Sequence, residues 1–198
     1  MADPTVTPQL RVQKTRKSRT MRDMLLSLGV VMVPILLITW LYTNNLSDYP
    51  VQPVDPTPMI AQARAEAPYP VYAPVNLPTG EGGWVVTQAS WVPKGASSRS
   101  GDGASSTDEW LWGGLDQSKT YYAVNESDDD PGRVIRRLSR DGSPDGTSTV
   151  EGKQWERWVS PDGRTRVLAL RENGYILAVT ADAPYEGLEA MASSLGTH

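Results

Sequence analysis

Residues 24–42 most constrain what this chain can fold into, because nineteen consecutive positions carry no charge. As a helix, that length matches the hydrocarbon thickness of a lipid bilayer. No polar stripe recurs at helical spacing, which argues against a buried helix of a soluble protein. The sequence therefore predicts one transmembrane helix, in contact with the lipid bilayer through residues 24–42.

The charges on either side of this helix predict its orientation. Six basic residues lie within residues 1–23, whereas the first one beyond the helix is Arg64. Because basic flanks stay in the cytoplasm, we expect a single-pass cell-membrane protein with a cytoplasmic N-terminus and an extracytoplasmic C-terminal domain. A cleaved signal peptide is the alternative. The long apolar run and the lack of a small-x-small cleavage site near its end favour an uncleaved signal-anchor.

The rest of the chain divides into three predicted segments. Residues 1–23 form a basic cytoplasmic tail, and residues 57–198 are long enough for one extracytoplasmic domain. Between the anchor and the domain, residues 43–56 form a proline-rich spacer whose prolines recur at the three-residue period of a polyproline II helix. A plain flexible linker is the alternative for this spacer.

Composition excludes several classes of function. The chain has no cysteine, and its one histidine is His198, so thiolate chemistry, a Ser-His pair and most zinc sites are excluded. Beyond residue 23 there are thirteen basic and twenty-one acidic residues, which argues against a nucleic-acid partner. Residues 141–147 resemble the start of a calcium loop, but position twelve is Gly152, and a turn is favoured. We expect no enzyme activity, no cofactor and no metal.

Residues 128–140 predict the clearest helix of the domain. Asp130 is placed to cap it, and Pro131 suits its first turn. Apolar side chains then share one face, and arginines fall within an arc of roughly 100° on the other. These arginines are the first candidate partner-binding residues: Arg133, Arg136, Arg137 and Arg140. Such a face suits phosphate or carboxylate groups of a partner, and a merely solvated face is the alternative.

The remaining patterns predict an α+β domain, in which an antiparallel sheet packs against two or three helices. A short helix opens with Thr57 as its N-cap, and a last helix covers residues 184–195. Ser160-Pro-Asp-Gly163 and Asn173-Gly174 are turn sequences typical of a meander. A Ser/Gly-rich stretch, residues 94–107, is expected to be an exposed mobile loop. The expected strands are 84–92, 109–115, 119–125, 147–151, 153–159, 165–171 and 175–181.

Tryptophans supply a second set of candidate contacts. Trp110 and Trp112 share one face of their strand, whereas Trp155 and Trp158 point to opposite faces, so at least one of that pair is expected at the surface. Exposed aromatic side chains beside arginines favour binding of a glycan or a partner subunit. Trp155 and Trp158 therefore complete the candidate partner-binding residues. Core filling in a chain without Phe is the alternative.

Three passages resemble a known family. They are the anchor with its basic approach, the juxtamembrane passage from Pro53 to the Ala67-Pro-Tyr-Pro-Val motif, and the run from Val150-Glu-Gly-Lys-Gln-Trp to Leu195. Together they resemble the actinobacterial single-pass membrane proteins catalogued as domain of unknown function 4245. This resemblance implies a location in an actinobacterial envelope and carries no catalytic residues. The Ser/Gly loop and Trp158 depart from the family's usual pattern.

These features favour a non-catalytic accessory or scaffold protein of a membrane or cell-envelope complex. Its membrane helix and spacer present a folded domain to a protein partner. A membrane-anchored binding domain for an envelope lipid or glycan is the alternative. A deep apolar cavity is the feature expected of the second function, and a flat aromatic and arginine surface that of the first.

Overall fold

The computed structural model describes residues 21–45, 52–78, 82–98, 101 and 103–197. The chain divides into two compact units, residues 1–50 and 51–198. Most of the predicted basic tail and residues 46–51 of the predicted spacer lie outside the described residues. Residues 43–45, predicted to begin the spacer, are instead the last residues of the helix Met21–Asn45.

Helix α1 (Met21–Asn45) is the apolar element of the first unit. Within it, residues 24–41 are long and apolar enough to cross a membrane, and none of them is buried inside the protein. The hydroxyl of Thr39 donates to the carbonyl of Ile35 at 2.8 Å, which satisfies a polar side chain within the helix itself. The helix is therefore a candidate membrane anchor or signal sequence.

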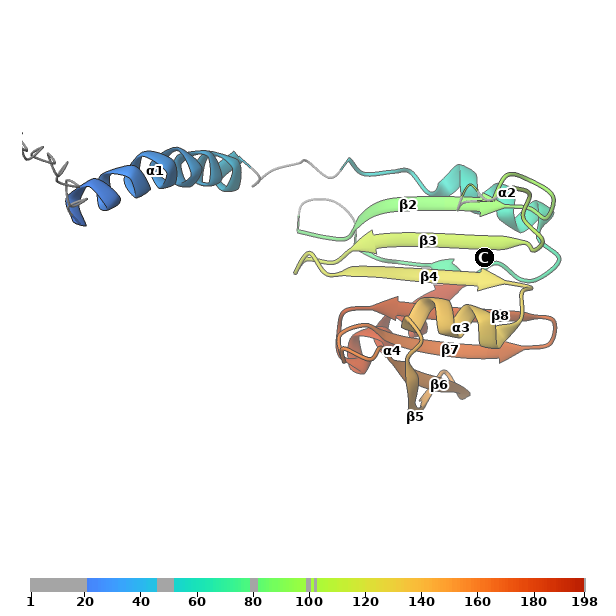
Figure 1. Cartoon of the computed structure of the whole chain (residues 1–198). Coiled ribbons are helices and arrows are strands. Elements are labelled where there is room, and N and C mark those ends of the chain that lie inside the picture. The colour runs from blue at the N-terminus through green and yellow to red at the C-terminus, as the bar shows by residue number, and fades with distance from the viewer. Residues whose placement is uncertain (1–20, 46–51, 79–81, 99–100, 102, 198) are drawn as a thin grey trace, which may run out of the picture. The chain divides into compact units, whose positions relative to one another are not determined.

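A seven-stranded antiparallel sheet is the centre of the second unit (Figure 1). Its spatial order is β2-β3-β4-β8-β7-β6-β5, so that the meander of the first three strands joins the second meander where β4 pairs with β8. The strands are β2 (Val85–Val92), β3 (Glu109–Leu115), β4 (Tyr121–Ser127), β5 (Ser143–Val150), β6 (Lys153–Val159), β7 (Arg166–Glu172) and β8 (Tyr175–Ala181). A short pair, β1 (Ala73–Pro74) with β9 (Leu195–Gly196), forms separately.

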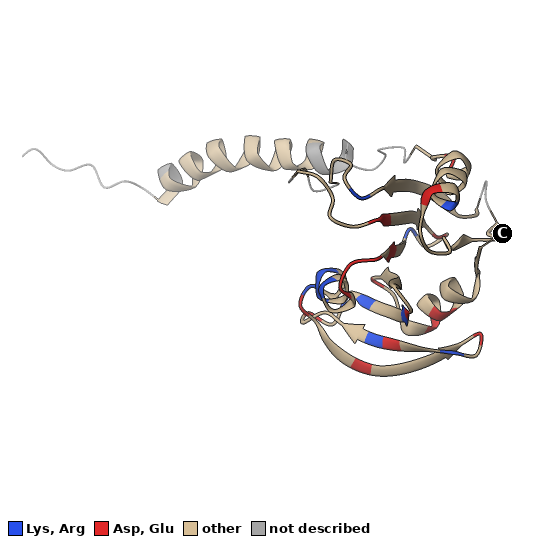
Figure 2. Cartoon of the chain, turned by 90° about the vertical axis from the view of Figure 1, so that its right-hand side faces the viewer, with Lys and Arg blue, Asp and Glu red and all other residues tan. Residues whose placement is uncertain are grey.

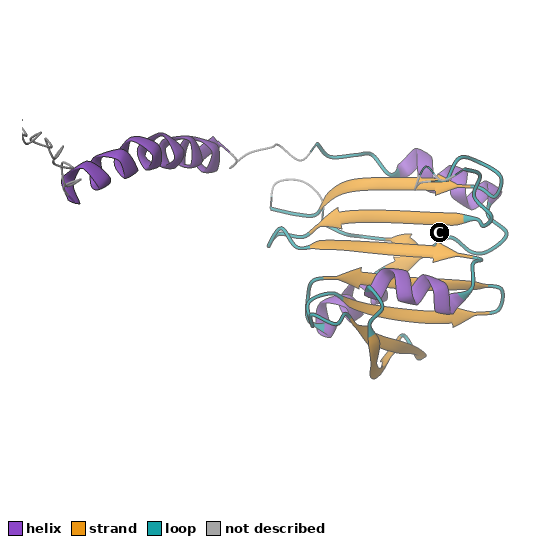
Figure 3. Cartoon of the chain, viewed as in Figure 1, coloured by secondary structure: helices purple, strands orange, loops and turns teal. Residues whose placement is uncertain are grey.

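Helices cover both faces of this sheet, and the alternation of strand residues separates two cores (Figure 3). On one face, α3 (Pro131–Ser139) buries Val134 and Ile135 against small and β-branched residues of β7 and β8. On the other face, α2 (Thr57–Glu66) and α4 (Tyr185–Ser193) pack on a larger core that contains Trp110, Trp112 and Trp155. The α+β prediction with three domain helices is confirmed.

Two local predictions need correction. Thr57 is the first residue of α2 rather than its cap, because its backbone N–H is taken by the carboxylate of Asp55 at 3.0 Å. The Ser/Gly-rich stretch carries its own small hairpin, in which Ser97 bridges Ala104 and two backbone hydrogen bonds join Ala96 and Gly95 to Ser105. Glycines with a positive φ, one before Ser97 and two between Ser97 and Ala104, allow the chain to turn back on itself here.

The end of the predicted spacer is attached to the domain. The backbone N–H of Val54 donates to the carbonyl of Val86 at 2.8 Å. Val86 lies beside a register shift in β2, the edge strand of the sheet, so the chain covers part of an otherwise open edge. Val54, in the predicted spacer, therefore belongs to the same compact unit as the sheet.

Candidate functional site

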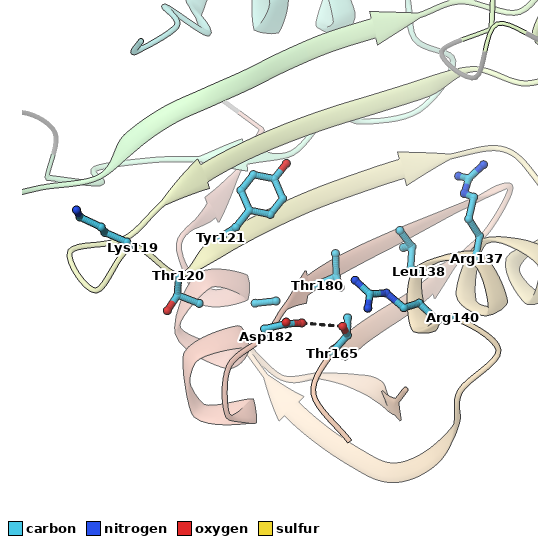
Figure 4. Close-up of a pocket in the computed structure, with 10 residues that line it drawn as sticks. Lys119, Thr120, Tyr121, Arg137, Leu138, Arg140, Thr165, Thr180 and Asp182 are labelled. Carbon is cyan, nitrogen blue, oxygen red and sulfur yellow. Dashed lines mark hydrogen bonds between the residues drawn. The ribbon is translucent and has the colours of Figure 1, made fainter. Parts of the chain in front are cut away.

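A hollow of about 550 Å³ lies beside the C-terminal end of α3 (Figure 4). Strands β4, β7 and β8 supply its hydroxyl-bearing wall, with Thr165 immediately before β7 and Thr180 in β8. Tyr121 lies at the start of β4 and leaves no room for a side chain at Gly113 across the strand pair. The residues that line the hollow are Lys119, Thr120, Tyr121, Arg137, Leu138, Arg140, Thr165, Thr180, Ala181 and Asp182.

All four predicted arginines are exposed on the solvent side of α3. Arg133 forms a 3.1 Å salt bridge with Asp129 one turn earlier, and Arg137 approaches Glu109 of β3 at 3.6 Å. Arg137 and Arg140 line the hollow, whereas Arg133 and Arg136 do not. The fold thus divides the arc predicted from the helical wheel into a pair at the hollow and an outward pair that does not line it. Figure 2 shows the distribution of Lys and Arg (blue) and of Asp and Glu (red) over the chain.

Backbone N–H groups cap the C-terminal end of α3. The arginine side chains are therefore not used for capping and can contact other groups. The backbone N–H of Arg140 donates to the last carbonyls of the helix, and the N–H of Asp141 donates to Arg136 at 2.8 Å. Arg140 has a φ of 56° in this cap, in a left-handed conformation that glycine adopts at lower cost. At the helix start, the Asp130 side chain accepts from the N–H of Arg133 at 2.9 Å, as predicted.

The single carboxylate of the hollow is already engaged. Asp182 accepts a 2.6 Å hydrogen bond from the Thr165 hydroxyl and a 3.4 Å contact from the Arg164 guanidinium. Across the hollow, Arg140 forms no salt bridge with the described residues. The hydrogen bond from Ser160 is the main cause that lowers the pKa of the nearby Asp162 carboxyl, and the charge of Arg140 adds a smaller effect in the same direction. The lining is therefore net positive within a domain of negative formal charge.

The two candidate tryptophans point to opposite faces, as predicted, but neither lines the hollow. Trp155 is only 3% exposed and fills the core beneath α4, so it is not accessible to a partner in this structure. Trp158 packs in part against the α3 core and donates its indole N–H to Glu156 at 3.1 Å. The structure thus brings Arg137 and Arg140 together with residues that sequence reasoning did not select.

A buried acid on the opposite face was missed from the sequence. Glu126 is 1% exposed, and one carboxyl oxygen accepts the backbone N–H of Tyr72 at 2.9 Å. Its other oxygen has no hydrogen-bond partner within the described residues. Burial raises the pKa of this carboxyl well above its ordinary value, so it is held in the neutral form. Glu126 lies opposite Trp110 in the sheet, in a row of core residues. Apart from the alternation of β4, the sequence carries no signal that this acid is buried.

A polar network near α4 has a structural role. Arg157 reaches both Ser148 and Glu189, and its guanidinium lies 4.6 Å from the ring centre of Tyr185. Hydrogen bonds from Ser148 and then Arg157 lower the pKa of the Glu189 carboxyl, which makes it a poor general base. Among the described residues, no group of three acidic side chains is placed to hold a metal ion.

Residues 16–195 match the family whose description is "Protein of unknown function (DUF4245)". No protein of curated function matches the chain. The match covers the apolar helix and almost all of the sheet domain, including every residue that lines the hollow. On this coverage, the chain belongs to the DUF4245 family.

Proposed function

We propose that this protein is a non-catalytic accessory or scaffold subunit of a membrane complex in an actinobacterial cell envelope. In this account α1 is an uncleaved single-pass anchor, the basic N-terminal tail is cytoplasmic and the sheet domain is extracytoplasmic. The contrast between six basic residues before the helix and acidic residues after it supports this orientation.

The outward side of α3 carries the proposal. Arg133 has 65% of its side chain exposed, and Arg136 is exposed beside it, in a domain whose formal charge is negative. Arginine presents a planar fork that pairs with carboxylates in two-point contacts. These two side chains are therefore suited to an acidic surface on a partner protein, with the buried face of α3 holding them on a rigid support.

Affinity purification tests the proposal. The full chain carries a C-terminal tag, native membranes are solubilised in mild detergent, and companions are identified by mass spectrometry. We expect a stoichiometric membrane protein, and we expect its recovery to fall at least tenfold in Arg133→Glu/Arg136→Glu. The control is Lys94→Glu, which reverses an exposed charge just after β2, outside α3, at a residue that forms no salt bridge with the described residues.

Three results would contradict the proposal: purification of the chain alone, retention of the partner by the α3 variant, or equal loss in the control. Orientation is tested separately, because the chain has no cysteine of its own. Gln117→Cys is expected to react with a membrane-impermeant maleimide on intact cells, and Thr7→Cys only after permeabilisation. The opposite labelling pattern would refute the topology.

A further inference from the structure

We propose that the hollow at the end of α3 is a binding site for a phosphate group, carried either by a small soluble molecule or by a lipid headgroup. This site goes beyond the proposed partner surface, because its basic residues are Lys119, Arg137 and Arg140 rather than the outward pair Arg133 and Arg136. Its defining feature is that cations from separate elements border the same hollow.

Charge in the hollow is local and unbalanced. Three basic side chains and one carboxylate line it, while the chain beyond residue 23 has thirteen basic and twenty-one acidic residues. Arg137 lies 3.6 Å from Glu109 of β3, and the carboxylate of the hollow, Asp182, already accepts from Thr165 and Arg164. Lys119 and Arg140 are therefore the lining cations that have no salt bridge with the described residues. A general excess of basic residues therefore does not explain the positive lining, and an anion is the ligand that the lining favours.

One cation extends into the hollow. Figure 4 shows the Arg140 guanidinium extending toward Thr165 and Thr180, whereas the charged ends of Lys119 and Arg137 lie at opposite margins and point away from Arg140. Helix capping does not occupy these side chains, because backbone N–H groups satisfy the end of α3. Within the described residues, neither Lys119 nor Arg140 has a salt-bridge partner. An anion that enters the hollow meets a guanidinium without first displacing a carboxylate from it.

Both of these cations occupy costly backbone positions. Lys119 has a φ of 64° and Arg140 a φ of 56°, and few non-glycine residues of the described chain share this conformation. An L-residue is less stable there than glycine. Stability alone thus favours glycine at both positions, whereas the sequence has a cation at each. This pattern fits residues that serve a ligand.

The hydroxyl groups and the size of the hollow indicate the ligand class. Thr120 and Thr180 offer donors beside the cations, and Leu138 and Tyr121 offer apolar surface. A phosphate has three oxygens that accept from such a mixed set of guanidinium, ammonium and hydroxyl donors. A volume of about 550 Å³ also leaves room for the polar group to which the phosphate is attached.

Calorimetric titration of the full chain in neutral detergent tests the assignment. Glucose 6-phosphate is the soluble probe, dihexanoyl phosphatidic acid is the headgroup probe, and glucose and glucuronate are the uncharged and carboxylate comparisons. We expect saturable binding of both phosphate probes, with no binding of glucose and at least tenfold weaker binding of glucuronate. Tighter binding of the first probe assigns a soluble ligand, and tighter binding of the second assigns a lipid.

The variants are chosen so that loss of binding is not confused with loss of folding. Arg140→Gly and Lys119→Gly each remove a cation and place glycine where φ is positive, so the thermal midpoint is expected to stay equal or rise. Affinity for both phosphate probes is expected to fall at least tenfold. Arg136→Ala, which removes the same charge from α3 outside the hollow, is expected to change affinity less than twofold.

The assignment is overturned if neither phosphate probe binds, if glucuronate binds as tightly, or if Arg140→Gly binds normally. Equal weakening by Arg136→Ala also overturns it, because that result indicates general charge attraction. Partner recovery in the purification experiment uses Arg133 and Arg136, so each proposal can fail while the other stands.

Discussion

Replacement of Glu126 by glutamine is expected to change how the stability of the domain depends on pH. Glu126 lies in the core beneath the passage that contains Tyr72, and burial raises the pKa of its carboxyl. At low pH the acid and the amide are close substitutes. Each accepts the Tyr72 N–H through one oxygen, and each has its second polar atom in a position without a partner among the described residues.

The sign of the effect follows from proton linkage. In the unfolded chain the carboxyl ionises with an ordinary pKa, so above that pH the folded state binds more protons than the unfolded state. The free energy of unfolding then falls as pH rises, by about 1.4 kcal/mol per pH unit while the folded carboxyl stays protonated. The stabilisation is complete below the unfolded pKa and is lost as pH approaches the raised folded pKa. Glutamine has no such loss.

Denaturant unfolding at a series of pH values measures this difference. Six of the seven tryptophans lie in the domain, so their fluorescence reports its unfolding in the full chain. As pH rises from the unfolded pKa toward the raised folded pKa, the free energy of unfolding of the original protein is expected to fall relative to that of Glu126→Gln. Glu186→Gln, at an exposed position on α4, controls for the change of charge. A constant difference between Glu126→Gln and the original protein would refute a neutral buried acid.

Three further predictions concern the supports of the fold. Asp130→Ala is expected to lower the free energy of unfolding by about 1 kcal/mol, because the N–H of Arg133 loses its cap. Thermal denaturation measures the change against Glu186→Ala, which removes an exposed carboxylate from α4. Gly142→Ala is expected to lower the free energy of unfolding by about 2 kcal/mol or more, because the new Cβ overlaps the backbone carbonyl of Val159, which has little freedom to move. Equal free energies of unfolding in denaturant would contradict that packing. Hydrogen bonds from Ser148 and Arg157 lower the pKa of the Glu189 carboxyl, so its stabilisation is present above the unfolded pKa and is lost as pH falls through the folded value. Glu189→Gln is therefore expected to flatten the acid limb of a stability–pH profile, and an unchanged limb would show that the contact contributes nothing.

Local sequence signals predicted the helices and strands closely because each element has its own start, period and stop. Asp130-Pro131 sets the beginning of α3, and Asn173-Gly174 sets the turn between β7 and β8. Strand β5 is the main departure, since it begins at Ser143 rather than at 147. A register shift between Pro144 and Thr147 lets a turn-like sequence continue the strand.

The hollow could not be predicted from local sequence patterns, because it depends on the order of the strands in the sheet. Lys119, Arg140, Thr165 and Asp182 are far apart in the sequence and meet only because β4 pairs with β8. Alternation along β6 correctly separates Trp155 from Trp158, but it does not say which face each helix covers. The burial of Trp155 follows from the placement of α4, and the neutral Glu126 follows from the passage that lies over it.

Site-specific photo-crosslinking in living cells tests the central claim most directly, because it reports what touches each face of the domain. A photoreactive residue replaces Gly132 in the first turn of α3, where an added Cβ lies 3.6 Å from the Arg136 guanidinium, so that Arg133 and Arg136 are both kept. A matched one replaces the exposed Ala190 on α4, which covers the opposite face of the sheet. We predict one discrete protein adduct from position 132 and none of that size from position 190. No adduct from position 132, or the same adduct from both positions, would contradict the account of α3 as a partner-binding surface.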